Sequence, residues 1–422
     1  MGPCPPPPAD SIVGLATDAS VNLSTQGAGT TPHLPGHLER VLFLATIPKQ
    51  PLDGPNLYTG VTAGPEPPSG TIPFEARADG GFCRWLLQSR STVAVSTYQA
   101  GVLAFFSWNG TQISVFLRRF EKVMGLDWDG SRLVVATRHA LVIHANSPVL
   151  ARRFRENGQY DALYLPRTSY HYPDLHVHDV GLVPDSVWMV NTRFNCLSHP
   201  SDRMTFEPIW FPPFITDLVP EDRCHLNGLA MRDGKPAFVT ALAETNIAGG
   251  WRDRKTKGGI VIEVESREIV ARDLSMPHSP RWHEGALYVL NSGSGELLRI
   301  DPQDGSREVI CHLTGYLRGL TFHGPHALVG LCQARETALF GGVPVAETGK
   351  RLLCGVALVD LRTGHTAGFL EITSGCTELF DLRVLRGEVR PAIVHIDSPD
   401  AKEAIALPHT HYWLRPENII KD

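Results

Sequence analysis

The chain has 422 residues, of which 42% are hydrophobic, and it carries a formal net charge of −5. This length and composition suffice for one large repeat domain or two ordinary domains with a buried core. Basic residues are scattered rather than grouped, which argues against a nucleic-acid partner. No stretch stays apolar for the roughly 20 residues that a membrane-spanning helix needs, so we expect no membrane association.

The eight cysteines are spread along the chain without any CxxC pair. This spacing argues against a zinc ribbon and against a dense disulfide framework. The first residues, "MGPCPPPPADSIVGLATDAS", lack the basic and then apolar regions of a secretory signal peptide. We therefore expect a cytoplasmic protein with reduced thiols; its oligomeric state stays open.

The first 80 residues differ in composition from the rest. Residues 1–37 are rich in Pro, Gly, Ser and Thr and hold few large apolar side chains, which predicts a disordered N-terminal extension. Residues 38–80 include the run "GPEPPSGTIP" and are interpreted as an irregular segment and linker.

Residues 81–400 contain short β-rich runs, such as "SRLVVAT", "SVWMVNT", "PAFVTAL", "GALYVLN" and "HALVGLC". Before each of these runs lies another short apolar run, often opened by glycine, as in "NGLAMRDG". Two more strands follow, most clearly in "GGIVIEVESREIVARDL". Four strands per unit of roughly 45 residues is the pattern of a propeller blade, so the predicted fold class is all-β.

The units begin with an incomplete one near 92–120, and blades then start near 123, 178, 225, 278 and 316. The incomplete unit lacks an innermost strand, which "ELFDLRV" at the other end of the chain can supply. We therefore predict a six-bladed β-propeller, with seven blades as the alternative because "RPAIVHI" is left over. Residues 401–422 are interpreted as a C-terminal tail.

The residues just before each innermost strand converge on the axis of a propeller, at one face of the ring. The innermost strands can be aligned on a position that is glycine in most blades. The residues three positions before it then form one column: Lys122, His178, His225, His278, Tyr316 and Glu378. Three histidines occupy consecutive blades of this column. His171 and His176 lie in an insertion and His409 and His411 in the tail, without counterparts in other blades, so they rank below the column.

Converging neutral imidazoles suit a divalent transition metal such as Fe, Cu, Zn or Mn. We therefore predict that His178, His225 and His278 bind one such ion, with Glu378 either a fourth ligand or a neighbour of the ligands. Asp179 is expected to orient an imidazole, as carboxylates behind metal sites do, and Asn227 to support the cofactor. The alternative is that the histidines line a polar channel or bond to backbone carbonyls.

The loops between second and third strands open on the same face of the ring and are polar. Two of them are long enough to act as walls or lids: residues 243–257 and 333–351. Arginine binds carboxylate or phosphate in bidentate fashion. The residues that we expect to position a substrate are Arg318, Arg335, Asn291 and Glu336.

The strings "PEDRCHLNGLAM", "MPHSPRWHEGALYVLNSGSGEL" and "CQARETALFGG" resemble those of a family of hypothetical bacterial proteins of propeller type, over residues from about 80 to about 385. More distantly, "NGLA" is similar to the regucalcin and gluconolactonase propellers, which bind a divalent metal with Glu and Asn. Asn227 matches that asparagine, whereas His225 departs from the pattern of oxygen ligands. Three axial histidines resemble peptidyl-hydroxyglycine lyase, a zinc propeller, and the iron-dependent carotenoid oxygenases.

Our hypothesis from the sequence is a metal-dependent enzyme that acts on a small polar or amino-acid-like substrate by oxidation, oxygenation or lyase chemistry. The alternative is a non-catalytic propeller that binds a peptide or protein partner across the mouth of its channel.

Overall fold

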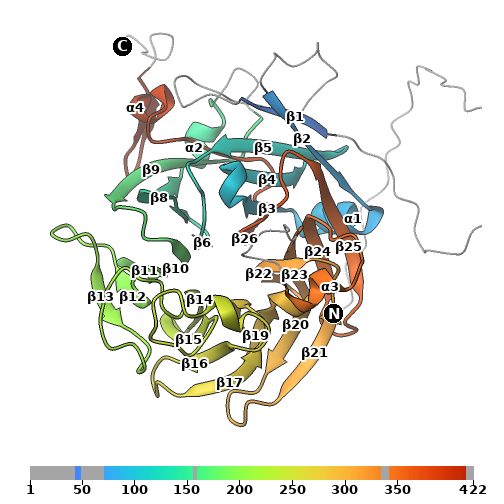
Figure 1. Cartoon of the computed structure of the whole chain (residues 1–422). Helices are drawn as coiled ribbons and strands as arrows, with labels where there is room; N and C mark the ends of the chain where they lie inside the picture. Colours follow the sequence, from blue (N-terminus) through green and yellow to red (C-terminus); the bar gives the residue numbers. More distant parts are fainter. Residues whose placement is uncertain (1–42, 49–70, 155–158, 334–341, 415–422) are drawn as a thin grey trace, which may run out of the picture. The chain divides into compact units, whose positions relative to one another are not determined.

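The computed structural model describes residues 43–48, 71–154, 159–333 and 342–414. Apart from one two-stranded hairpin, their strands form six sheets that stand side by side around a central axis as the blades of a ring (Figure 1). The prediction of an all-β, six-bladed propeller is confirmed. The predicted disordered extension, residues 1–37, lies outside the described residues.

Three blades contain four consecutive antiparallel strands each. Blade 3 holds β10 (Val177–Val183), β11 (Ser186–Asn191), β12 (Cys196–His199) and β13 (Glu207–Trp210). Blade 4 holds β14 (Leu226–Arg232), β15 (Lys235–Ala241), β16 (Gly259–Glu263) and β17 (Ile269–Leu274). Blade 5 holds β18 (Pro277–His283), β19 (Ala286–Asn291), β20 (Glu296–Ile300) and β21 (Arg307–His312).

The ring closes by strand exchange between the two ends of the propeller. Blade 1 has the order β26 (Leu382–Arg386), β3 (Ser91–Ser96), β4 (Val102–Trp108) and β5 (Ile113–Arg119). Its innermost strand therefore comes from the C-terminal side, as predicted. Blade 2 holds β6 (Leu126–Trp128), β7 (Arg132–Ala136), β8 (Ala140–Asn146) and β9 (Ala162–His171). The run "RPAIVHI", on which the seven-blade alternative was based, contains β27 (Pro391–Ile393). This strand pairs in parallel with β9 and forms no seventh blade.

Blade 6 is the widest sheet. Its four inner strands are β22 (Tyr316–His323), β23 (His326–Cys332), β24 (Gly355–Asp360) and β25 (Thr366–Ser374). Two strands continue it outward, β2 (Thr71–Ala78) on β25 and then β1 (Phe43–Pro48). Part of the segment that we expected to be irregular, residues 38–80, thus belongs to a blade, and Phe74, Ala76 and Ala78 are buried on alternate positions of β2.

Short helices and one hairpin lie outside the strands of the blades. The helices are α1 (Gly80–Ser89), α2 (Pro148–Ala151), α3 (Pro344–Glu347) and α4 (Pro399–Glu403), with 3₁₀ turns η1 (Tyr98–Ala100), η2 (Arg252–Arg254) and η3 (Ser292–Ser294). The C-terminal hairpin consists of β28 (Ala404–Ala406) and β29 (His411–Trp413). Trp413 packs against Phe154 near blade 2, with ring centroids 6.0 Å apart.

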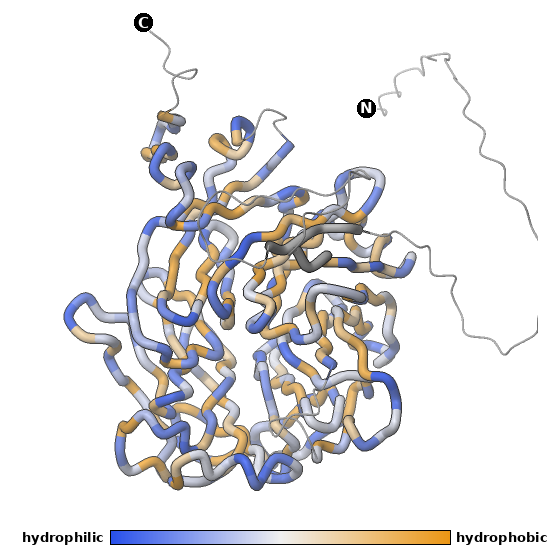
Figure 2. Tube along the Cα trace, turned by 45° about the horizontal axis from the view of Figure 1, so that its top comes forward, coloured by the Kyte–Doolittle hydropathy of each residue, from blue (hydrophilic) through white to orange (hydrophobic). Residues whose placement is uncertain are grey.

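Local sequence explains why the inner strands pair as they do. In blade 4 the pair Arg232 and Lys235 flanks the turn Asp233–Gly234, whose φ angles are 53° and 74°. Two residues with positive φ form the tight hairpin whose twist matches that of the strands, and Asp-Gly suits it. The strands are mostly hydrophobic and many loops are hydrophilic (Figure 2). The buried hydrophobic clusters combine residues of neighbouring blades, so the core lies between the blades.

Candidate functional site

One cavity of about 150 Å³ lies where the innermost strands begin. Five of the six residues of the predicted column line it: His178, His225, His278, Tyr316 and Glu378. The sixth, Lys122, instead reaches Asp174, with Nζ 3.6 Å from Oδ2. The three histidines that the alignment of the repeats places in one column therefore line one cavity.

His178 and His278 are held by the same local arrangement in two different blades. Nδ1 of His178 lies 2.9 Å from the carbonyl oxygen of His176, and Nδ1 of His278 lies 2.9 Å from that of Met276. In both cases the residue two positions earlier has a positive φ, 53° and 47°. A carbonyl oxygen only accepts hydrogen bonds, so Nδ1 carries the proton and Nε2 keeps its lone pair.

A threonine strengthens this assignment for His178. The hydroxyl of Thr192 donates to the carbonyl oxygen of Leu226 at 2.6 Å and lies 2.8 Å from Nδ1 of His178. Since the hydroxyl of Thr192 already donates its proton to the carbonyl oxygen of Leu226, its oxygen accepts the hydrogen bond from Nδ1 of His178.

His225 is oriented by a carboxylate. Its Nδ1 lies 2.9 Å from Oδ2 and 3.0 Å from Oδ1 of Asp222, and the indole of Trp251 donates to the same Oδ2 at 3.1 Å. Asp222 and His225 both have left-handed backbones, with φ of 48° and 52°. Such conformations cost energy in non-glycine residues and concentrate at functional sites. His225 thus uses Nδ1 on Asp222, and Nε2 is its other ring nitrogen at the cavity.

Burial keeps two of the histidines uncharged. The pKa of His178 lies well below its ordinary value because of burial, with further lowering by His225 and Arg318. The pKa of His278 is likewise far below its ordinary value, through burial and then the charge of Arg318. Both imidazoles are therefore neutral at physiological pH, which is the form that binds a metal ion.

Arg318 is the buried positive charge at the cavity and is only 6% exposed, whereas Arg252 lies at its exposed rim. Its guanidinium carbon lies 4.1 Å from the centre of the Phe380 ring, and Nη1 donates to Oε1 of Glu378 at 3.1 Å. Its Nη2 lies 3.5 Å from Nε2 of His278. Oε2 of Glu378 is buried and has no hydrogen-bond partner in the described part of the chain.

The three imidazoles do not form a finished metal cage. His178 and His225 pack edge to face with ring centroids 4.8 Å apart, while His278 adjoins Arg318. Among the residues described, no three His, Cys, Asp or Glu side chains are arranged so that they could hold an ion as they stand. Metal binding at this place would require side-chain movement, above all of Arg318 away from His278.

Asp179 was expected to orient an imidazole, and the structure places it elsewhere. Its Oδ2 lies 2.7 Å from Nη1 of Arg281 and accepts the backbone N–H of Leu229 at 3.0 Å. Arg383 bonds Asp381 at 2.8 Å and Asp127 at 3.1 Å, and it lies 3.6 Å from Asp179. We call these residues the axial ion network: Asp127, Asp179, Arg281, Asp381 and Arg383.

Two other predicted residues serve the fold rather than the cavity. Asn227 donates to the carbonyl oxygen of Pro277 and accepts from Thr240, and Asn291 accepts from the backbone N–H of Ser275 and donates to Glu296. Both are buried, and neither lines the cavity. Arg335 and Glu336 lie outside the described residues.

Sequence reasoning missed several residues of the site. Asp222 and Trp251 contact His225, and Tyr98 also lines the cavity. His176, which we ranked below the column, lines it as well. Trp251 and Arg252 come from the loop 243–257, which we expected to form a wall. The sequence signal for Asp222 is the "DRCH" spacing, which has no counterpart in the other blades and so escapes a comparison of repeats.

Comparisons with solved structures find distant matches. Similar solved structures include a nidogen/laminin complex (9% identity, 70% of this chain and 99% of that chain, TM-score 0.42) and a protein of unknown function from Bacteroides caccae (9%, 70% and 99%, 0.44). A calcium-binding protein, regucalcin from Agrobacterium tumefaciens, covers 58% of this chain and 73% of its own at 12% identity and TM-score 0.38. Likeness at this level does not transfer function.

No curated protein matches the chain. No helix in the described ranges is long and apolar enough to cross a membrane. A family model described as "Domain of unknown function (DUF4915)" matches residues 80–394. Since this match spans most of the ring and most of the sequence, the chain belongs to the DUF4915 family.

Proposed function

We propose that this protein is a metal-dependent enzyme in which His178, His225 and His278 bind one divalent transition metal, Fe, Cu, Zn or Mn. The observation that carries the proposal is that all three imidazoles use the same ring nitrogen, Nδ1, to bind the protein. Each donates a hydrogen bond from Nδ1 to an oxygen of the protein and lines the same small cavity, so Nε2 is the nitrogen that would bind a metal ion. Metal-binding histidines are held in this way, by a carboxylate or carbonyl behind the ring.

The donor set fits such an ion in its chemistry. Nε2 of His178 and of His225 has no hydrogen-bond partner among the described residues, and Nε2 of His278 meets only the long contact from Arg318. Glu378 is the candidate for a fourth ligand, because its Oε2 is buried without a partner. Neutral imidazoles with one carboxylate suit Fe, Mn or Zn and leave coordination positions open for a substrate.

A bound ion would polarise a substrate oxygen, activate water or activate O₂. Arg318 would bind the carboxylate of a small polar or amino-acid-like substrate, since its guanidinium is fixed by Phe380 and Glu378 at the cavity. Trp251 and Arg252 would cover the mouth of the cavity. Oxidation or oxygenation is the first candidate reaction, and lyase chemistry is the second.

Elemental analysis of protein purified without a histidine tag tests this proposal. We expect about one transition-metal ion per chain in the wild type and almost none in the double variant His225→Ala/His278→Ala. The matched control is His409→Ala, which removes an exposed histidine outside the cavity and should keep the metal. Equal metal contents in the wild type and the double variant, or no metal in either after growth with each of the four metals, would favour the alternative, a non-catalytic propeller that binds a peptide or protein.

A further inference from the structure

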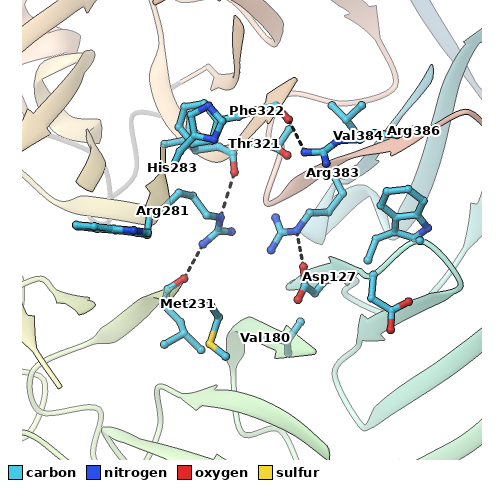
Figure 3. A pocket seen from close by; sticks show the side chains of 16 residues that line it. Asp127, Val180, Met231, Arg281, His283, Thr321, Phe322, Arg383, Val384 and Arg386 are labelled. Atoms are coloured by element: carbon cyan, nitrogen blue, oxygen red, sulfur yellow. Dashed lines mark hydrogen bonds and ion pairs between the residues drawn. The ribbon is translucent and has the colours of Figure 1, made fainter. Parts of the chain in front are cut away.

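A second and larger cavity, about 530 Å³, lies at the other ends of the innermost strands. All six blades contribute to it, through Trp128 of β6, Val180 of β10, Met231 of β14, His283 of β18, Phe322 of β22 and Arg386 of β26. Its volume is within the usual range of small-molecule sites. Figure 3 shows the side chains that surround it.

This cavity is separate from the one that holds the histidines. In β10, His178 lines the first cavity and Val180 lines the second, and between them Asp179 is only 3% exposed. The axial ion network thus lies across the axis between the two cavities. A ligand in the second cavity would therefore not reach the histidines.

The walls of the second cavity are flat and aromatic. The rings of His283 and Phe322 stack with centroids 4.1 Å apart and planes inclined by 1°. Trp128 and Trp282 also line the cavity. The pKa of His283 is lowered, mainly by burial and further by Arg386, so its ring is neutral at physiological pH. These surfaces suit the face of a planar apolar group.

Three guanidinium groups line the cavity, together with the carboxylates of Asp127 and Asp129. Asp127 forms an ion pair with Arg383, and Asp129 forms one with Arg132. Arg281 and Arg383 face each other across it, and Arg386 lies near them beside Phe322 (Figure 3). The charges of Arg281 and Arg383 are offset by the carboxylates of the axial ion network. Arg386 is exposed, and in the described part of the chain no carboxylate forms an ion pair with it; its Nη2 donates to the carbonyl oxygen of Phe322 at 3.3 Å.

We propose that the second cavity binds a small organic anion with a planar apolar body, of the class of aromatic carboxylates. The carboxylate pairs with the guanidinium of Arg386, and the ring packs against the aromatic wall that includes the stacked pair of His283 and Phe322. This site is independent of the metal-dependent activity proposed above, because different residues on the opposite side of the axial ion network form it.

Calorimetric titration of the full chain with benzoate tests this assignment. Acetate carries the charge without the ring, and benzyl alcohol carries the ring without the charge. We expect benzoate to bind with one site per chain, and both other compounds to bind at least about tenfold more weakly. Arg386→Gln should weaken benzoate binding by about tenfold or more, because it removes the charge-assisted pair. Arg386 is exposed, so this variant should keep the thermal unfolding midpoint of the wild type.

Two control variants separate this site from other arginines. Arg390→Gln removes an exposed arginine outside the cavity, and Arg318→Gln removes the arginine of the histidine cavity; both should bind benzoate as the wild type does. The proposal is overturned if the wild type does not bind benzoate, if Arg386→Gln binds it with unchanged affinity, or if Arg318→Gln alone abolishes the binding.

Discussion

The carboxylate of Asp222 lies 2.9 Å from Nδ1 of His225 and fixes which nitrogen of that imidazole carries the proton. The same carboxylate accepts the indole N–H of Trp251, which belongs to the loop at the mouth of the cavity. One half-buried acid therefore connects a candidate metal ligand with a wall of the site. In metal sites, such partners behind the ligands are worth 10-fold to 100-fold in affinity.

Replacement of Asp222 by alanine should weaken metal binding about 10-fold to 100-fold, because His225 loses the acceptor that holds its ring. Asp222→Asn should bind more tightly than Asp222→Ala, since an amide oxygen still accepts from Nδ1. Titration of metal-free protein with Zn²⁺ measures both effects. Asp217→Ala, at an aspartate whose side chain is 65% exposed, serves as the control. Equal affinities of Asp222→Ala and wild type would exclude the positioning role.

Arg318 should oppose metal binding. Its Nη2 lies 3.5 Å from Nε2 of His278, so a cation on that nitrogen would meet a like charge. We therefore expect Arg318→Gln to raise the affinity for Zn²⁺, by about tenfold or more, and also to free Glu378. Arg252→Gln, at the exposed rim of the same cavity, should change it much less. A lower affinity in Arg318→Gln would mean that the arginine supports the metal site instead.

His144 should make the fold sensitive to acid. Burial lowers its pKa to about 3, whereas an unfolded chain takes up this proton near pH 6.5. Below pH 6.5 the unfolded state binds more protons than the folded state, so stability falls as the pH falls from about 6.5 towards 3. At pH 5 this one group should cost about 2 kcal/mol relative to neutral pH.

The variant His144→Phe removes this titration but keeps a ring that can pack against Phe120. Urea denaturation at pH 7.5 and at pH 5 should show a loss of stability that is about 2 kcal/mol smaller than in the wild type. His365→Phe, at an exposed position, should keep the pH dependence of the wild type. The same dependence in His144→Phe would speak against a neutral buried imidazole.

The axial ion network should be important for stability. Arg383→Met leaves Asp381 and Asp127 without a main partner in the buried centre, and removal of one partner from a buried ion pair costs about 3–5 kcal/mol. Arg362→Met breaks an ion pair with Asp360 in which the arginine side chain is 74% exposed, and it should cost less than about 1 kcal/mol. The free energies of unfolding in urea give both values. Similar losses in the two variants would contradict the claim that the buried network stabilises the fold more than the exposed ion pair does.

The sequence predicts the ring because each blade repeats the same order of strands and turns, and the repeat also aligns His178, His225 and His278. The turn Asp233–Gly234 and its counterparts fix the register of the inner hairpins. Closure by the last inner strand was predictable because the first unit lacks one. The strand β2 was not predicted, since the proline-rich run before it is typical of a linker, although the alternation of Phe74, Ala76 and Ala78 favours a strand.

Residues outside the repeat were harder to place. Asp179 directly follows His178 where the pairing of β10 with β11 is irregular, and it reaches Arg281 rather than the cavity. Asn227 and Asn291 satisfy backbone groups of neighbouring segments, and such long-range partners leave no pattern in the sequence. Membership in a family of unknown function, which we expected, is confirmed by the family match. Regucalcin is among the solved structures that the comparison found. The likeness to peptidyl-hydroxyglycine lyase stays a prediction.

The central claim is that three histidines of consecutive blades bind one metal ion. Calorimetric titration of the metal-free, untagged chain with Zn²⁺ at pH 7.5 tests it most directly, beside the three single variants His178→Ala, His225→Ala and His278→Ala. The account predicts one site per wild-type chain and a loss of affinity of at least about tenfold in every single variant. A wild type without a site, or variants that all bind Zn²⁺ as tightly as the wild type, would contradict it.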